Sequence, residues 1–247
     1  MATIKLPEKD PTLEAADDAM LRAENAKPRR AYLGMSQIGH PCSRMLWYSF
    51  HDPLPRQIPI SGLRAINDGH TSEEVMAHRL KQIEGVELAT CDENGEQFAV
   101  SDFDGKFAGH MDGAIHGLLQ APKTWHVWEA KATNEKKFKK LRDLKMTLGE
   151  KNTLKVWDET YYAQAQCYMG YTGMRRHYLT VSTPGVRDWE AVRTEFNQAD
   201  FDAIRDKADR ILNARAPLAK ISNDPSWFQC SWCDYRERCH GTAPVSA

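Results

Sequence analysis

The chain has 247 residues, of which 41% are hydrophobic and 27% are charged, a composition that suits one well-cored α/β domain with elaborations. No apolar stretch approaches the length that crosses a bilayer, which argues against an integral membrane protein. The formal net charge of −1 argues against binding of nucleic acid through an overall basic surface. Any such binding would depend on a local cluster of positive charge.

The first 35 residues are predicted to form a charged arm, helical over about residues 10–26 and ending at Lys27-Pro28-Arg29-Arg30. The opening segment has no apolar signal region, so we expect a protein of a reducing, cytoplasmic compartment in which cysteines do not form disulfides. Residues 36–247 are predicted to form a single domain.

The first metal-ligand candidates lie in two expected helices. A short helix is predicted around Cys42, with Pro41 in its first turn and aromatic residues that pack near the thiol. After a proline-rich loop over residues 52–59, a longer helix through about residue 84 carries His70. Imidazole nitrogen binds divalent metals, so His70 is a candidate ligand, although a lone histidine is more often an ordinary core or surface residue.

Four strands are predicted near residues 86–91, 97–101, 106–116 and 125–132. Asp112 falls in the third strand between Gly109 and Gly113, two glycines that are expected to leave room for a closely bound cation. Glu129 and Lys131 fall in the fourth strand at i and i+2, so their side chains point to the same face.

Two carboxylates from neighbouring strands beside an ammonium suit the metal-assisted hydrolysis of a phosphodiester. Mg²⁺ prefers oxygen ligands and completes its shell with water and substrate phosphates. Such an ion polarises the phosphoryl oxygen and lowers the pKa of an attacking water. Lys131 would position or deprotonate that water, and its protonation state stays open because carboxylates raise its pKa while burial and cations lower it.

A run of basic residues follows the Glu129 strand. It is a solvated helix face or a surface that neutralises DNA phosphates beside the metal site. The candidate DNA-binding residues are Lys136, Lys137, Lys139, Lys140 and Arg142, followed by Lys145, Lys151 and Lys155.

The next expected helix, from Tyr161 to Gly170, carries Tyr161, Gln164 and Tyr168 on one face at i, i+3 and i+7. Their hydrogen-bonding tips suit contact with phosphates or bases, whereas the simpler interpretation is a partly buried helix. Two strands follow, over residues 174–182 and 188–196. A last amphipathic helix ends before Pro217.

Four of the cysteines lie near the two ends of the predicted domain, one near its start and three near its end. Cys230, Cys233 and Cys239 form a C-x₂-C-x₅-C trio, and Cys42 stands alone near the start. Four thiolates match the ligand count of an iron–sulfur cluster or a structural zinc, and the spacing does not choose between them. Two further interpretations are a Cys₃His zinc site using His40 or His240 and, for the C-x₂-C pair, a redox site. Cys91 and Cys167 are expected to be small hydrophobic residues, the first at a strand end and the second in the Gln164 helix.

Taken in order, these motifs resemble those of RecB-type nucleases within the PD-(D/E)XK superfamily. The four cysteines resemble the iron–sulfur staple of the AddB nuclease domain and of the CRISPR-associated RecB-like exonucleases. The resemblance implies an α/β restriction-endonuclease-like core, a mixed central sheet flanked by helices, with the chain ends joined at the cysteines. The implied metal ligands for Mg²⁺ or Mn²⁺ are His70, Asp112 and Glu129. The implied catalytic residues are Asp112, Glu129, Lys131, Gln164 and Tyr168, and the implied [4Fe-4S] ligands are Cys42, Cys230, Cys233 and Cys239.

The implied activity is that of a metal-dependent DNA exonuclease in repair, recombination or phage replication, from a bacterium or a phage. No Walker A loop is present, so a helicase or recombinase would be a separate protein. Two alternatives remain: a structure-selective endonuclease, or a non-catalytic iron–sulfur or zinc module that binds nucleic acid.

Overall fold

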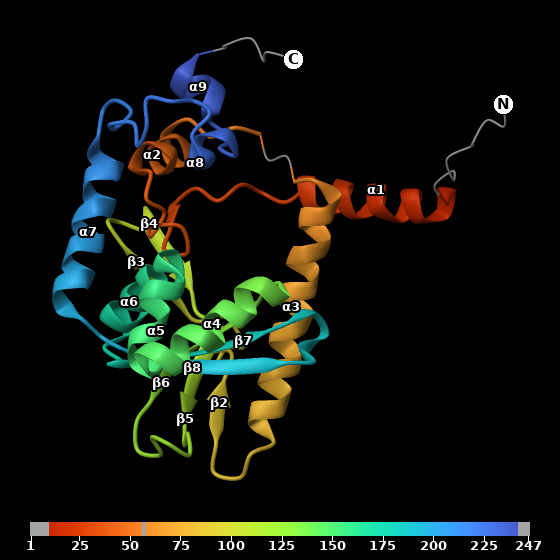
Figure 1. Ribbon diagram of the computed structural model, residues 1–247, viewed down its shortest axis with the longest axis vertical. Coiled ribbons are helices and arrows are strands. Elements are labelled where there is room, and N and C mark those ends of the chain that lie inside the picture. Colours follow the sequence, from red (N-terminus) through yellow and green to blue (C-terminus); the bar gives the residue numbers. More distant parts are fainter. Residues whose placement is uncertain (1–9, 56–57, 242–247) are drawn as a thin grey trace.

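The computed structural model describes residues 10–55 and 58–241, which form a mixed α/β fold built on two β-sheets (Figure 1). The larger sheet has five strands in the order β2-β5-β6-β7-β8. Only the central pair, β6 and β7, is parallel, and all other neighbours are antiparallel. The strands are β2 (Glu87–Ala89), β5 (Gly113–His116), β6 (His126–Ala132), β7 (Arg176–Ser182) and β8 (Trp189–Glu195).

A smaller sheet has the order β1-β4-β3, with β1 (Leu33–Gly34) parallel to β4 (Phe107–His110) and β3 (Ala99–Asp102) antiparallel to β4. Because β1 lies in this sheet and both Leu33 and Met35 are buried, the end of the predicted arm is part of the core.

The predicted strand over residues 106–116 is wrong as a single element. The chain leaves the small sheet after β4, and residues 111 and 112 connect it to β5 in the large sheet. The Met111 amide still donates to the carbonyl of Phe98, the residue before β3 of the small sheet, at 2.9 Å, whereas Gly113 already pairs with Trp128 of β6. Asp112 therefore lies at the junction of the two sheets.

Helices cover both faces of the large sheet. On one face, Met76 and Leu80 of α3 pack in a buried cluster with Trp128 and Ala130 of β6. The other face, which includes Val127, packs on α4, α5 and α6. The helices are α1 (Pro11–Asn25), α2 (Ser43–His51), α3 (Ile60–Lys81), α4 (Glu135–Leu148), α5 (Glu150–Trp157), α6 (Glu159–Thr172), α7 (Gln198–Asn213), α8 (Phe228–Ser231) and α9 (Arg236–His240), with a short 3₁₀ helix η1 (Pro184–Val186).

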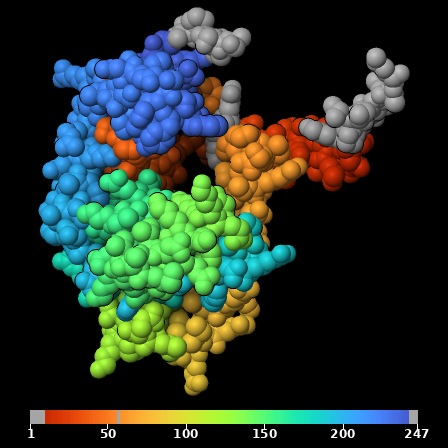
Figure 2. Space-filling view, viewed as in Figure 1, coloured from red at the N-terminus to blue at the C-terminus, as the bar shows by residue number. Residues whose placement is uncertain are grey.

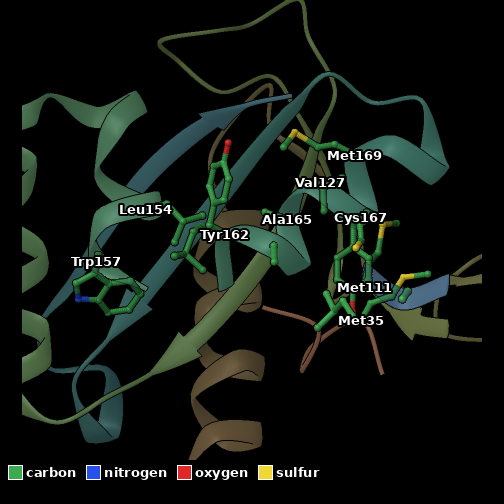
Figure 3. Packing of buried hydrophobic residues seen from close by; sticks show 14 of the residues in the cluster. Met35, Met111, Val127, Leu154, Trp157, Tyr162, Ala165, Cys167 and Met169 are labelled. Carbon is green, nitrogen blue, oxygen red and sulfur yellow. The ribbon is translucent and has the colours of Figure 1, made fainter. Parts of the chain in front are cut away.

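Side-chain caps explain where the helices near β6 begin. Asn134 accepts a hydrogen bond from the Lys137 amide at the start of α4, and Asp158 accepts one from the Tyr161 amide at the start of α6. These caps start α4 three residues after β6 ends and bring α6 back across the same face. Figure 3 shows the buried core that results, in which Ala165 and Met169 of α6 lie near Val127.

Helix α2, near the start of the predicted domain, lies against the C-terminal segment. Trp47 Nε1 of α2 donates to the Ala214 carbonyl at 2.8 Å, and Tyr48 Oη donates to the Arg238 carbonyl at 3.2 Å. Tyr48 also stacks on Tyr235, with ring centroids 5.5 Å apart. Helix α1 extends away from the rest of the fold beside the start of α3 (Figure 1). Within the described residues, no helix combines the length and apolar character needed to cross a membrane.

Candidate active site

The predicted acidic residues and lysine converge at the sheet junction. Asp112 Oδ2 accepts a hydrogen bond from the Ala130 amide at 2.8 Å, which holds the carboxylate against β6. Lys131 Nζ lies 2.6 Å from Glu129 Oε1 and 3.9 Å from Asp112 Oδ2. The strand alternation that was expected to align Glu129 with Lys131 is present. The side chains of Asp112 and Lys131 are 12% and 20% exposed, so solvent reaches the site.

Helix α6 supports this group from behind. Gln164 Nε2 donates to Glu129 Oε1 at 2.9 Å and lies 3.1 Å from Tyr168 Oη. Tyr168 Oη in turn donates to the His110 carbonyl at 2.7 Å, two residues before Asp112. Gln164 and Tyr168 are only 4% and 1% exposed, so they hold the acidic residues in place and do not face a nucleic acid directly.

The expectation that Gly109 and Gly113 leave room for a cation is wrong, because protein atoms fill that space. A Cβ at Gly109 would lie 2.7 Å from the Tyr168 ring, and a Cβ at Gly113 would lie 2.5 Å from the Ala89 carbonyl oxygen. The two glycines therefore permit close packing of α6 on β4 and of β2 on β5, the strands on either side of Asp112.

Burial and mutual charge shift the protonation of the group. Burial raises the pKa of Glu129 to about 8, with Asp112 adding to the rise and Lys131 opposing it. Burial lowers the pKa of Lys131, but the charges of Glu129 and Asp112 outweigh burial and raise it above its ordinary value. Lys131 is therefore an ammonium, a donor and not a base, in the metal-free site.

Glu73 of α3 is a site residue that the sequence analysis missed. Burial raises its pKa to about 7, and the next contributions come from the charges of Asp112 and Lys131, which places the Glu73 carboxyl in the field of the site. His70 lies one helical turn earlier, at i−3, and its side chain is exposed. The structure records no contact between His70 and Asp112 or Glu129 in the described ranges, so its role as a ligand stays a prediction.

The site has spare acceptor capacity for a cation. Glu129 Oε2 is buried and has no hydrogen-bond partner among the described residues, although such atoms are normally paired. No three His, Cys, Asp or Glu side chains in the described part of the chain are spaced to hold one ion. Two carboxylates nevertheless suffice for a Mg²⁺ site, because water and substrate phosphates supply the remaining ligands.

Half of the eight predicted basic residues are engaged in ion pairs. Lys137 pairs with Asp158 at 2.6 Å and lies over the rings of Trp157 and Tyr161. Residues further along the run pair in the same way, namely Lys145 with Glu190, Lys151 with Glu195 and Lys155 with Asp200. The exposed α4 residues for which the described chain shows no ion pair are Lys136, Lys139, Lys140 and Arg142.

Figure 2 shows a hollow between the C-terminal segment in blue, the start of α3 in orange and the α4–α6 region in green. Its walls thus include the helices that carry Glu73 and Gln164 and the helix that carries the four unpaired basic residues.

A second candidate site lies between α2 and the C-terminal segment. Cys42, Cys230, Cys233 and Cys239 line one pocket there, and all six cysteines of the chain are free. Cys42 is the N-cap of α2 and accepts a hydrogen bond from the Met45 amide, and Pro41 precedes this cap instead of lying in the first turn. Three buried polar atoms of pocket-lining residues have no partner among the described residues: Arg44 Nε, Gln229 Oε1 and His240 Nε2.

The two remaining cysteines differ from each other. Cys167 is fully buried in α6, as predicted for a small hydrophobic residue. Cys91 is exposed in a bend after β2, so the expectation of a small hydrophobic residue at a strand end is wrong for this cysteine.

No protein-family model matches the chain, and no curated protein matches it. Solved structures do resemble it. The crystal structure of SSO0001 is 13% identical with a TM-score of 0.53, over 96% of this chain and 100% of that one. The alkaline exonuclease LHK-Exo from Laribacter hongkongensis is 15% identical with a TM-score of 0.50, over 79% of this chain and 90% of that one.

LHK-Exo in complex with dAMP is 14% identical, also with a TM-score of 0.50, over 74% of this chain and 86% of that one. At such low identity these likenesses establish the fold alone. They confirm the predicted class: the chain has a mixed α/β fold, with mixed sheets flanked by helices, that is shared with an alkaline exonuclease.

Proposed function

We propose that the protein is a metal-dependent DNA nuclease that acts as an exonuclease. The observation that carries the proposal is the convergence of Asp112, Glu129 and Lys131 at the junction of the two sheets. The fold shared with an alkaline exonuclease, a protein also solved in complex with dAMP, supports it.

The acidic residues fit a hard divalent cation, Mg²⁺ or Mn²⁺. Asp112 and Glu129 would hold the ion, since Glu129 Oε2 is buried without a partner. Glu73 lies in the electrostatic field of the same site, and His70 is the further ligand that the RecB resemblance implies. When bound, the ion supplies Lewis-acid polarisation of the phosphate and activation of water.

The chain's own residues orient the reaction. The Lys131 ammonium, fixed by Glu129, donates to the attacking water or to a phosphate oxygen as negative charge develops. Gln164 donates to the same oxygen of Glu129, Oε1, as Lys131 does, and Tyr168 fixes the backbone before Asp112. In this proposal Gln164 and Tyr168 are positioning residues.

DNA would approach along α4, where Lys136, Lys139, Lys140 and Arg142 are exposed and lack ion pairs within the described chain. Such residues neutralise phosphates without reading sequence, so affinity should fall with salt. Lys137 contributes less in this proposal, because Asp158 already neutralises it.

The cysteine pocket would hold a [4Fe-4S] cluster that joins the two chain ends. Four thiols line one pocket, and the pocket contains polar atoms that lack partners in the described residues. Zinc is the alternative occupant, and a single ion would require the four thiols to move together, because no three such side chains of the described residues are spaced to hold one ion. A helicase or recombinase that supplies DNA ends would be a separate protein, in a reducing cytoplasm that keeps the thiols free.

The test is cleavage of labelled single-stranded, duplex and circular DNA with Mg²⁺ or Mn²⁺. Lys131→Met and Asp112→Asn should each reduce cleavage by about a thousandfold or more, because each removes a group that stabilises the transition state. Both variants should melt within a few degrees of the wild type, and Lys123→Met, an exposed lysine in the turn before β6, is the control. Full activity of either site variant refutes the proposal, as does absence of cleavage by the wild type in both ions. Cleavage of circular DNA would identify an endonuclease instead.

A further inference from the structure

The pocket between α2 and the C-terminal segment contains hydrogen-bond donors that nothing else uses. Arg44 Nη1 donates to the Leu218 carbonyl at 2.8 Å, and Nη2 donates to Tyr48 Oη at 3.4 Å. The third nitrogen, Nε, is buried without a partner among the described residues. His240 follows Cys239 at the end of α9, and its Nε2 is likewise buried without a partner among the described residues.

Arg44 and His240 both line the pocket, and no other lining residue accepts a hydrogen bond from these two nitrogens. A buried donor without an acceptor destabilises the folded protein, and native proteins pair nearly all such donors. Neither nitrogen makes a hydrogen bond to a cysteine sulfur, even though Cys42, Cys230, Cys233 and Cys239 line the same pocket. The missing acceptor is therefore expected from a group that occupies the pocket.

The charges indicate the chemistry of that group. Arg44 is permanently cationic, and its remaining contacts are to neutral oxygens of Pro217, Leu218 and Tyr48. A cation that is partly buried without a carboxylate partner favours an anionic occupant. A [4Fe-4S] cluster with four thiolates carries net negative charge, and its sulfur atoms accept hydrogen bonds.

We propose that Arg44 Nε and His240 Nε2 donate hydrogen bonds to sulfur atoms of the [4Fe-4S] cluster and thereby raise its reduction potential. This inference rests on the cluster assigned in the proposed function. Reduction adds negative charge to the cluster, so a donor at sulfur stabilises the reduced form more than the oxidised form. Gln229 becomes a third donor if its amide is turned by half a rotation, which exchanges Oε1 for Nε2.

The experiment uses the full chain, purified without oxygen, and measures iron content, visible absorbance and the midpoint potential in a dithionite titration. Arg44→Lys keeps the charge and removes the Nε donor. His240→Phe removes the ring donor, whereas His240→Gln restores an N–H near the Nε2 position. Arg238→Lys is the matched control, because Arg238 binds the Asp52 carbonyl at 2.6 Å and does not line the pocket.

We expect Arg44→Lys and His240→Phe to shift the midpoint potential of the cluster to more negative values. The visible absorbance of both variants should bleach faster in air than that of the wild type. His240→Gln should recover most of the shift, and Arg238→Lys should match the wild type. Wild-type potentials in iron-containing Arg44→Lys and His240→Phe overturn the inference while leaving the cluster in place. If Arg44→Lys loses its cluster, the midpoint potentials of His240→Phe and His240→Gln test the inference.

The inference and the nuclease proposal fail in different ways. A colourless wild-type protein that contains zinc overturns the cluster and the inference together, yet leaves cleavage by Asp112, Glu129 and Lys131 untouched. A brown protein with shifted variant potentials but no cleavage supports the inference and refutes the nuclease.

Discussion

The acidic site and the cysteine pocket differ in how far the chain alone completes them. At the acidic site, Glu129 is bound by both Lys131 and Gln164, and Asp112 is held by a backbone amide. In the cysteine pocket, four thiols remain free and three buried polar atoms lack partners among the described residues. The chain's own contacts thus hold the acidic residues in place, whereas the pocket leaves buried polar atoms of the described residues without partners.

This difference indicates which of the two sites contributes more to the stability of the fold. Residues of the acidic site are positioned by strands and by α6, so loss of a cation should leave them in place. The pocket joins α2 to the C-terminal segment, and its occupant would link residues that are far apart in sequence. Removing the occupant should therefore destabilise the protein, and removing the cation should chiefly stop the reaction.

The largest expected effect on stability is that of Cys230→Ser. Binding energy at a thiolate site is also folding energy, so losing the occupant should cost several kcal/mol. For a chain of this size that lowers the Tm by about 10 °C or more, measured by calorimetry. Cys91→Ser, at an exposed cysteine outside the pocket, should melt like the wild type. A soluble Cys230→Ser protein with normal melting and no bound metal would remove the contrast between the two sites.

The next effect is the pH dependence of cation binding. Because the pKa of Glu129 is raised to about 8, the empty site holds a proton below that pH, and a cation must displace it. Mn²⁺ affinity should therefore weaken by up to about tenfold for each pH unit below 8 and level off above it. The free energy of unfolding of the metal-free protein has the opposite trend. It falls as the pH rises from about 4.5 towards 8, because over this range the Glu129 carboxyl loses its proton in the unfolded chain and keeps it in the folded protein.

Calorimetric titration of Mn²⁺ between pH 6 and 9 measures this dependence. Glu73→Gln should make the profile less steep below pH 7, because the pKa of Glu73 is raised to about 7. Glu84→Gln, at an exposed residue beyond α3, is the control. A pH-independent affinity would show that Glu129 is ionised before the cation binds.

A moderate effect is expected for Tyr168→Phe. The substitution leaves the His110 carbonyl without its donor and should destabilise the fold by about 1–3 kcal/mol. It should also lower kcat by about tenfold, which corresponds to about 1.4 kcal/mol of lost positioning. Tyr162→Phe on the same helix removes a 2.6 Å bond to Asp200, away from the site. Equal losses of kcat in the two variants would mean that Tyr168 acts only through stability.

The smallest effect concerns the exposed lysines of α4. Replacing Lys139 and Lys140 by Gln should weaken DNA binding several-fold and reduce the slope of log affinity against log salt by about 2, one for each phosphate contact. Fluorescence anisotropy over a salt series measures both quantities. Lys151→Gln is the control, because Lys151 is paired with Glu195. An unchanged slope would place the DNA elsewhere.

Local patterns predicted most of the fold because most elements follow local rules. The strand expected over residues 125–132 is β6, and the Gln164 helix is α6, each with its cap or alternation visible in the sequence. The two strands expected over residues 174–182 and 188–196 are β7 and β8.

The remainder depends on contacts between distant residues. The change of sheet at Asp112 is decided by which strands pair with β4 and β5, and the sequence from 106 to 116 shows no break. Glu73 was missed because an acidic residue on an exposed-looking helix has no local mark of burial. Its spacing of three from His70 was the one available signal. The partners of the lysines, such as Glu190 for Lys145, are likewise distant in sequence.

The position of Asp112 between two sheets has a mechanical consequence. Its carboxylate depends on the small sheet through the Met111 amide and on the large sheet through Gly113. A tilt of one sheet against the other would change the gap between Asp112 and Glu129, and so alter the fit of the cation. Substitutions in β3 should therefore affect the position of the Asp112 carboxylate through the main chain.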